Sequence, residues 1–295
     1  MTGDLKAAIE TLDPERPVLI AGPTASGKSA FALAIAAAQG GRVINADALQ
    51  VYSDWSILTA RPSVEDIQSV PHALYGHVAS DAPYSVGDWL RDLAPHLTGP
   101  RPIIVGGTGL YLSTLTEGLA DIPATSIEIR RTADARLATE GPAALLAELD
   151  PITAARIDRQ NPVRIQRAWE VQKTTGRGLA TWQDETGPPL LPTTEAHTLV
   201  LHADRDWLSD RIAQRFDAML SAGVLDEARR NRPGWHPDRP SAKAIGAAEL
   251  MAHLDGAMDL QNLHDRVTVL TRQYAKRQRS WFRARMKHWQ WLSCH

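Results

Sequence analysis

The chain has 295 residues, 43% of them hydrophobic and 22% charged, and its formal net charge is −2. This length and composition allow a large buried core in one or two domains and exclude a disordered chain, while the near-neutral charge excludes a global positive field that would attract nucleic acid. No apolar run approaches the roughly 18 residues that span a bilayer, the start of the chain is polar, and Cys294 has no partner for an internal disulfide, so we expect a cytoplasmic protein with no membrane contact.

A phosphate-loop motif follows the first predicted strand, Pro17–Ala21. The stretch Ser29–Gln39 then has the pattern of a helix, which Gly40 ends. A strand, a glycine-rich turn and a helix aim backbone N–H groups at one point, where the helix dipole favours an anion. Lys28 would add a positive charge and the Ser29 hydroxyl a ligand for Mg²⁺. The residues predicted to bind a diphosphate or nucleotide, ATP included, are Gly22, Pro23, Thr24, Ala25, Ser26, Gly27, Lys28 and Ser29.

Two more apolar segments, Arg42–Ala46 and Pro102–Val105, are predicted strands, and the second leads into a helical pattern as the first strand of the chain does. This alternation of strands and helices predicts an α/β fold, a phosphate-loop parallel sheet wrapped by helices. Asp47 directly follows the Arg42–Ala46 strand. Because open α/β sheets bind ligands at the carboxyl ends of their strands, we expect Asp47 to lie near the phosphate loop.

An all-helical insertion is predicted at 119–196, between core segments 1–118 and 197–295. It consists of charged segments with a helical pattern, and it ends in a linker rich in proline and threonine. The second core segment begins with a return strand at Thr198–Leu201, followed by a helix on which Arg211 and Arg215 share a face. These two arginines either point towards the ligand cleft or form surface pairs with neighbouring aspartates. The four predicted helices of the insertion cover Ile127–Thr139, Pro142–Leu149, Ala154–Asp158 and Arg164–Thr175.

A basic helix is predicted near the end of the second core segment. The stretch from Arg266 to Lys287 has no acidic residue, whereas a solvated helix face usually alternates in sign, so this stretch favours contact with a polyanion. Its basic residues are Arg266, Arg272, Lys276, Arg277, Arg279, Arg283, Arg285 and Lys287.

The phosphate loop has no partner strand that ends in a second acidic residue, because Pro102–Val105 runs into Gly106 and Gly107. Motor ATPases need such a residue for magnesium and water, and no guanine-reading Asn-Lys-x-Asp sequence occurs either. This leaves a small transferase, with Asp47 as its base or its magnesium anchor.

At this point the residues resemble the tRNA dimethylallyltransferases, also called tRNA isopentenyltransferases. The similarity extends from about Val18 to Trp291. Its main motifs are the phosphate loop, Asn45–Tyr52 (NADALQVY), Thr59–Pro62 (TARP), Val105–Tyr111 (VGGTGLY), Arg164–Val171 (RIQRAWEV) and Thr271–Phe282 (TRQYAKRQRSWF). The resemblance implies transfer of a dimethylallyl group from dimethylallyl diphosphate to the exocyclic amine of the adenosine that is 3′-adjacent to the anticodon in tRNA.

The resemblance also implies roles for individual residues. Asp47 would be the general base, and Thr24, Lys28 and Arg215 would act on the departing diphosphate, with Mg²⁺ as the cofactor at Ser29. The chain would act as a monomer, with its insertion on the anticodon stem-loop. The residues implied to contact tRNA are Asp47, Ala48, Leu49, Gln50, Thr108, Arg130, Val163, Arg164, Ile165, Gln166 and Arg167.

The chain departs from the family pattern at a few positions. Ala247 and Ala248 stand where the family often has Tyr-Lys, while Ala48 and Leu58 replace a serine and a glycine. The first departure removes an aromatic and a basic side chain that contact RNA in the family, so we expect weaker or differently distributed RNA binding at this segment. The changes to Ala48 and Leu58 remove no charged catalytic group. Three alternative functions remain open from the sequence: an adenylate isopentenyltransferase that modifies free nucleotides, a small-molecule kinase, and a nonenzymatic RNA-binding module.

Overall fold

The computed structural model describes residues 2–295 and divides the chain into two compact units. The first unit joins the residues up to Thr116 with Leu191–His295, and the second is Glu117–Leu190. The sequence places the end of the insertion at residue 196, whereas the structure keeps Leu191 with the first unit. Leu191 is buried in the core of that unit, and its backbone N–H donates to the Leu115 carbonyl at 3.1 Å.

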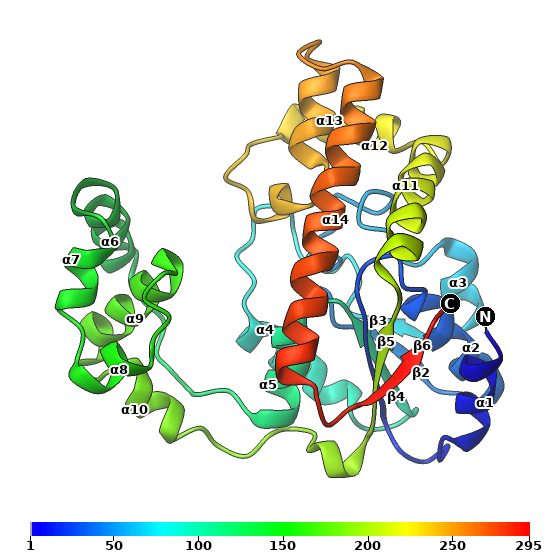
Figure 1. Ribbon diagram of the computed structural model, residues 1–295, viewed down its shortest axis with the longest axis horizontal. Coiled ribbons are helices and arrows are strands. Elements are labelled where there is room, and N and C mark those ends of the chain that lie inside the picture. Colours follow the sequence, from blue (N-terminus) through cyan, green and yellow to red (C-terminus); the bar gives the residue numbers. More distant parts are fainter. Residues whose placement is uncertain (1) are drawn as a thin grey trace. The chain divides into compact units, whose positions relative to one another are not determined.

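The first unit contains a six-stranded parallel sheet, which confirms the predicted α/β fold (Figure 1). The strand order is β3-β2-β4-β1-β5-β6. The two edge strands, β3 and β6, are short and were not predicted. The strands are β1 (Val18–Ala21), β2 (Arg42–Asn45), β3 (His72–Ala73), β4 (Pro102–Gly106), β5 (His197–His202) and β6 (Gln290–Ser293).

Helices cover both faces of this sheet because the side chains of the inner strands alternate between two apolar clusters. Val18 and Ile20 of β1 pack into the cluster that contains Phe31, whereas Leu19 of the same strand packs into the cluster that contains Trp89. Strands β1 and β4 are buried along their whole length, as central strands of a parallel sheet are. The first face is covered by α1 (Gly3–Thr11) and α2 (Lys28–Gln39), and the second by α4 (Val86–Leu93) and α5 (Gly109–Glu117).

A third apolar cluster lies beyond the strands and is built from the helices that follow β5 together with residues of the loop between β2 and α3. It includes Trp55, Phe216 and Leu263. The helix α14 extends from this cluster, at Leu263, to the sheet, where Phe282 is buried (Figure 1). The helices that follow β5 are α11 (Arg205–Ser221), α12 (Val224–Asn231), α13 (Ala247–Leu254) and α14 (Leu260–Arg285). The first unit also contains α3 (Val64–Ser69) and four short 3-10 turns, η1 (Ala94–His96), η2 (Thr193–Glu195), η3 (Arg232–Gly234) and η4 (Pro240–Lys243).

The second unit is helical throughout and has its own core. Trp169 and Ile165 are buried there, and the Trp169 indole N–H donates to Glu148 at 2.8 Å. Its helices are α6 (Ile127–Glu140), α7 (Pro142–Ala147), α8 (Pro151–Arg156), α9 (Pro162–Thr175) and α10 (Leu179–Asp184).

Across residues 2–295, no helix combines the length and the apolar character that crossing a membrane requires.

Candidate functional site

The phosphate loop joins β1 to α2 at the carboxyl end of the sheet. Its backbone enters the left-handed region at Ala25 (φ 64°) and Gly27 (φ 85°). Gly22 is required for close approach, since a Cβ there would lie 2.8 Å from the Ser26 hydroxyl oxygen and 3.3 Å from Leu201 Cβ. The helix α2 therefore begins at Lys28 with free N–H groups facing the turn, which is the arrangement that binds phosphate.

One open cavity brings together the charged residues that the sequence singled out. Of the predicted site residues, its walls contain Thr24, Lys28, Ser29, Asp47, Leu49, Gln50 and Arg215. The remaining walls are largely apolar, with Leu58, Ile212, Phe216, Met219 and Val267 among them. Charged groups beside apolar walls fit a ligand with an anionic head and a short hydrocarbon tail.

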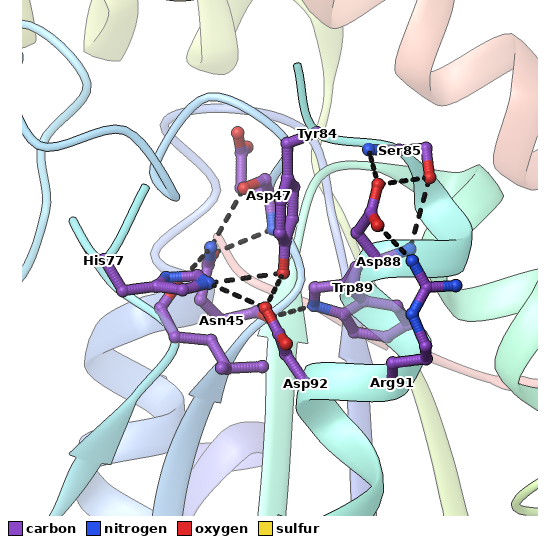
Figure 2. Close-up of polar contacts among 10 residues, drawn as sticks. Asn45, Asp47, His77, Tyr84, Ser85, Asp88, Trp89, Arg91 and Asp92 are labelled. Carbon is purple, nitrogen blue, oxygen red and sulfur yellow. Dashed lines mark hydrogen bonds and ion pairs between the residues drawn. The ribbon is translucent and has the colours of Figure 1, made fainter. Parts of the chain in front are cut away.

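Asp47 is held by its neighbours through its backbone (Figure 2). Its N–H donates to Asn45 Oδ1 at 2.8 Å, and Asn45 Nδ2 donates to the Asp47 carbonyl at 2.9 Å. Trp89 of α4 in turn donates its indole N–H to the Asn45 carbonyl at 2.8 Å. The end of β2 is thus fixed from two sides, which places the Asp47 side chain at the cavity.

The two carboxylate oxygens of Asp47 are used differently. Oδ1 accepts the N–H of Leu49 at 3.0 Å, which closes a turn. No helix follows Asp47, so its side chain is not a helix cap. Oδ2 has no hydrogen-bond donor within the described part of the chain, so this oxygen is available to accept a proton from a ligand.

The segment after Asp47 is tied to two other loops. The N–H of Ala48 donates to the Thr108 hydroxyl at 2.9 Å, so Thr108 braces this turn and is not a wall of the cavity. Gln50 donates its amide to the carbonyls of Thr59 and Ala60, both at 2.9 Å. Its amide oxygen keeps its acceptor capacity, because neither of these bonds uses it.

Lys28 and Arg215 carry the positive charge of the cavity. Burial lowers the pKa of Lys28 to about 8, and this effect prevails over the nearby charge of Asp47, which raises the pKa. Arg215 lowers the pKa of Lys28 further, and burial also lowers the pKa of Arg215 itself. Neither cation forms an ion pair within residues 2–295. Lys28 Nζ donates only to the Pro23 carbonyl, at 3.4 Å, and two cations held together without an ion pair favour an anionic ligand.

The affinity of this cavity for inorganic diphosphate is expected to decline as the pH rises above about 8. The anion binds the protonated Lys28, so the affinity is fully present below the pKa of about 8 and is lost as the ammonium group loses its proton. Calorimetric titration of wild type and Lys28→Arg at pH 7 to 9.5 measures this. The guanidinium stays charged throughout, so the ratio of the wild-type affinity to that of the arginine variant should fall, by up to about tenfold per pH unit. A constant ratio would contradict the assignment.

Arg211 and Arg215, which share a helix face in the sequence pattern, lie in different environments in the structure. Arg215 lines the cavity, whereas Arg211 is exposed, donates from Nε to the Ala25 carbonyl at 3.2 Å and lies over the Trp207 ring. The shared face predicted from their spacing is therefore divided between the cavity and the outer side of the phosphate loop.

Gln278 of α14 is a site residue that the sequence reasoning missed. Its side chain is buried, and Oε1 accepts the Thr24 N–H at 2.9 Å while Nε2 donates to the Gly107 carbonyl at 2.9 Å. Gly107 must be glycine, since a Cβ there would lie 2.2 Å from Gln278 Nε2 and 3.4 Å from Asp47 Oδ2. Gln278 thus connects the phosphate loop to the segment beside Asp47. The motif around Gln278 marks this helix, but only the fold shows the two partners.

Replacing Gln278 by methionine is expected to lower the free energy of unfolding by about 1–3 kcal/mol, because the change leaves the Thr24 N–H and the Gly107 carbonyl without their partner. Denaturant unfolding monitored by circular dichroism measures this. Gln273→Met is the matched control, since Gln273 is exposed on the same helix and should change stability by less than about 0.5 kcal/mol. Equal stability of both variants would show that the bridge contributes nothing.

Tyr274 is a second wall residue that the sequence reasoning did not assign. Burial and the charge of Asp47 raise its pKa, so its hydroxyl stays protonated and can donate a hydrogen bond in the cavity.

The remaining predicted contacts belong to the second unit. Arg130, Val163 and Arg164 are exposed, and Val163 is 74% exposed despite its apolar side chain. Ile165 is buried in the core of this unit, so its side chain does not reach the surface. Two others are engaged inside the unit, Gln166 with Asp134 at 2.7 Å and Arg167 with the Thr125 hydroxyl at 2.8 Å.

Protein ligands for a metal are few at the cavity. The described residues contain no cluster of three or more His, Cys, Asp or Glu side chains that could hold an ion. The cavity supplies the Ser29 hydroxyl and the single carboxylate of Asp47. This set fits Mg²⁺, which keeps several waters and binds through one or two protein groups together with substrate phosphates.

Comparison with known proteins gives consistent matches. A family model described as IPP transferase matches residues 50–285, and one described as isopentenyl transferase matches residues 16–75. The tRNA dimethylallyltransferase of Ruegeria sp. (strain TM1040) is 58% identical over 286 residues, covering 97% of this chain and 98% of that protein. The tRNA dimethylallyltransferase of Paracoccus denitrificans (strain Pd 1222) is 58% identical over 288 residues, with 95% of each chain covered.

Two solved structures are also similar. The full-length tRNA isopentenylpyrophosphate transferase of Bacillus halodurans is 34% identical with a TM-score of 0.65, and the match covers 95% of this chain and 90% of that one. A eukaryotic dimethylallyltransferase acting on tRNA is 27% identical with a TM-score of 0.79, and the match covers 95% of this chain and 74% of that one.

Proposed function

The chain belongs to the IPP transferase family, that of the tRNA dimethylallyltransferases, and from this premise we propose which ligands its cavity takes and how its residues act on them. The protein is a prenyltransferase that modifies tRNA. We propose dimethylallyl diphosphate as the donor, and as the acceptor the exocyclic amine of the adenosine 3′-adjacent to the anticodon. The observation that carries this proposal is one cavity in which Lys28, Arg215 and Asp47 lie beside apolar walls.

The diphosphate is the group that the cations stabilise. As the bond between the donor's C1 and its oxygen breaks, negative charge builds up on the leaving diphosphate. The ammonium of Lys28 and the guanidinium of Arg215 line the cavity and form no ion pair within the described residues, so their charge is available to that anion. The Thr24 hydroxyl lies in the same wall and can donate one more hydrogen bond. The dimethylallyl group would contact the apolar residues.

The amine of adenine is a poor nucleophile because its lone pair is delocalised into the ring. As its nitrogen bonds to C1 of the donor, the amine must lose a proton. We propose that Asp47 Oδ2, which has no donor of its own, takes this proton. The products are the N6-dimethylallyl adenosine, free diphosphate and the proton held at Asp47, which then passes to water.

The adenosine must leave its stack to reach the cavity, which costs a few kcal/mol from a single-stranded loop. We propose that the exposed Arg130, Val163 and Arg164 of the second unit contact the anticodon stem-loop. Arginine contacts to phosphate give affinity rather than sequence choice. At the cavity, Leu49 and the free amide oxygen of Gln50 would contact the base.

Magnesium is proposed as the cofactor. Ser29, with the donor's own phosphates, would hold it, and it would supply positive charge to the departing diphosphate. We further propose that the chain acts as a monomer, since one chain builds the whole cavity, and that it acts in the cytoplasm.

A direct assay tests the proposal. The protein is incubated with Mg²⁺, dimethylallyl diphosphate and either total tRNA or AMP, and the digested products are analysed by mass spectrometry. Prenylated adenosine from tRNA alone supports the proposal. Prenylated AMP would indicate the adenylate isopentenyltransferase, and phosphate transfer from labelled ATP to an acceptor would indicate the kinase. Either result, in the absence of modified tRNA, would overturn the proposal.

A further inference from the structure

A second cavity lies on the outer side of the phosphate loop. It is open to solvent, and we call it the arginine pocket after Arg205, Arg279 and Arg283 in its wall. Pro23 of the phosphate loop also lines it, whereas Thr24, the next residue, lines the catalytic cavity. The loop therefore separates the two cavities, and none of the catalytic residues discussed above lines the second one.

The three arginines converge without partners. None of them forms an ion pair or a side-chain hydrogen bond within the described residues. Arg279 is half-buried, and its pKa is lowered by burial and by the charges of Arg283 and Arg205. Arg205 and Arg283 are exposed, so water and solvent ions screen part of the repulsion among the three charges, and a bound anion would lower it further.

The acidic groups nearby do not neutralise the pocket. Asp204 lies in its wall, but its carboxylate is exposed and pairs with His295 at 3.0 Å. Asp206 is in the first turn of α11 and is exposed. The charge of Asp204 does act on Arg279 and raises its pKa, but Asp204 is the one carboxylate in the wall, it also pairs with His295, and it does not balance three arginines.

The start of α11 adds to the positive potential. This helix has 17 residues, and its N-cap residue, Asp204, makes no capping hydrogen bond with its side chain. The first N–H groups are therefore left to solvent or to a ligand. Arg205, the first residue of the helix, carries a positive charge at the positive end of the helix dipole, which is unfavourable in the absence of an anion.

We propose that the arginine pocket is a second, noncatalytic binding site for a small phosphate anion, with inorganic diphosphate as its ligand. Diphosphate is chosen because the transfer reaction releases it on the other side of the same loop, so only the identity of the anion rests on the proposed function. A small anion is favoured over an RNA backbone because Arg279 lies half-buried in a hollow whose walls include the buried Phe282 and the half-buried Trp291.

Calorimetric titration with inorganic diphosphate tests this site apart from catalysis. Wild type is expected to bind two diphosphates per chain and Lys28→Met, which weakens the catalytic site, to retain one. The double variant Arg279→Gln/Arg283→Gln should lose the second site, with its affinity lowered at least about tenfold by the loss of two charges. The same double change in the Lys28→Met background should abolish binding. A single site in wild type, or two sites in the double variant, would overturn the proposal.

A matched control uses the same helix. Arg272→Gln/Arg285→Gln removes two exposed arginines that do not line the pocket, and it should keep both sites. The affinity of each double variant for an anticodon stem-loop RNA is measured in parallel. If Arg279→Gln/Arg283→Gln weakens RNA binding and leaves two diphosphate sites, the pocket contacts RNA and the proposal is wrong. If the enzyme transfers no prenyl group but the diphosphate titrations behave as stated, the pocket stands and the proposed function fails.

Discussion

Replacing Asp47 by asparagine is expected to lower kcat for dimethylallyl transfer by about 10²- to 10⁴-fold, because the amide cannot accept the proton of the adenine amine. The substitution preserves the local structure, since an asparagine Oδ1 can still accept the N–H of Leu49 at 3.0 Å. The backbone bonds to Asn45 are also unaffected. Single-turnover transfer at saturating tRNA and donor measures the chemical step.

The assignment of Asp47 requires that binding survive its loss. The affinity for tRNA, measured by fluorescence anisotropy, should change by less than about threefold, which is under 1 kcal/mol. Asp210→Asn is the control, because Asp210 is exposed on α11 and has no ion pair within the described residues. A comparable loss of rate and of tRNA affinity in Asp47→Asn would show that Asp47 binds or folds rather than acts as a base.

Replacing Arg215 by glutamine should lower kcat/KM for dimethylallyl diphosphate by about 10²- to 10³-fold, as the removal of one group that stabilises transition-state charge does elsewhere. The guanidinium lines the cavity near Lys28 and forms no ion pair within the described residues, so its charge is available to the leaving diphosphate. Because that charge develops as the C1–O bond breaks, most of the loss should be in kcat. Steady-state rates at varied donor concentration separate the two constants.

Arg211→Gln offers a matched comparison on the same helix, one turn earlier. Arg211 contacts the Ala25 carbonyl from the outer side of the phosphate loop and is not a wall of the cavity. Its replacement should change kcat/KM by less than about tenfold, through the lost support of the loop. If both variants lose the same activity, the arginines act through the structure of the loop, and the role proposed for Arg215 is wrong.

The parts of the site that lie close in sequence were predictable. The phosphate loop and α2 follow β1 directly, and Asp47 follows β2, so local pattern and the rule for parallel sheets place both at one edge. The contribution of α11 to the cavity wall was predictable only in part. Spacing puts Arg211 and Arg215 on one face, but which of them lines the cavity depends on how α11 packs against the loop.

The contacts that join distant segments were not predictable. Gln278 meets Thr24 across 254 positions of sequence, and nothing in its neighbours distinguishes it from the exposed Gln273. The strand β6 (Gln290–Ser293) has only four residues and no β-branched side chain, so its pairing with β5 is a result of the fold rather than of propensity. The arginine pocket was not predictable for the same reason, since Arg205 and Arg279 come together only when α11 and α14 pack against each other.

The strand order has a consequence for synthesis on the ribosome. The inner strand β1 pairs with β4 on one side and with β5 on the other, and β5 is made only after the whole of Glu117–Leu190. That intervening unit has its own apolar cluster and follows the first four strands out of the exit tunnel. Throughout its translation β1 keeps one apolar edge unpaired, which is the state that promotes aggregation. We therefore expect nascent chains to depend on chaperones during this interval and to be released from them once β5 emerges.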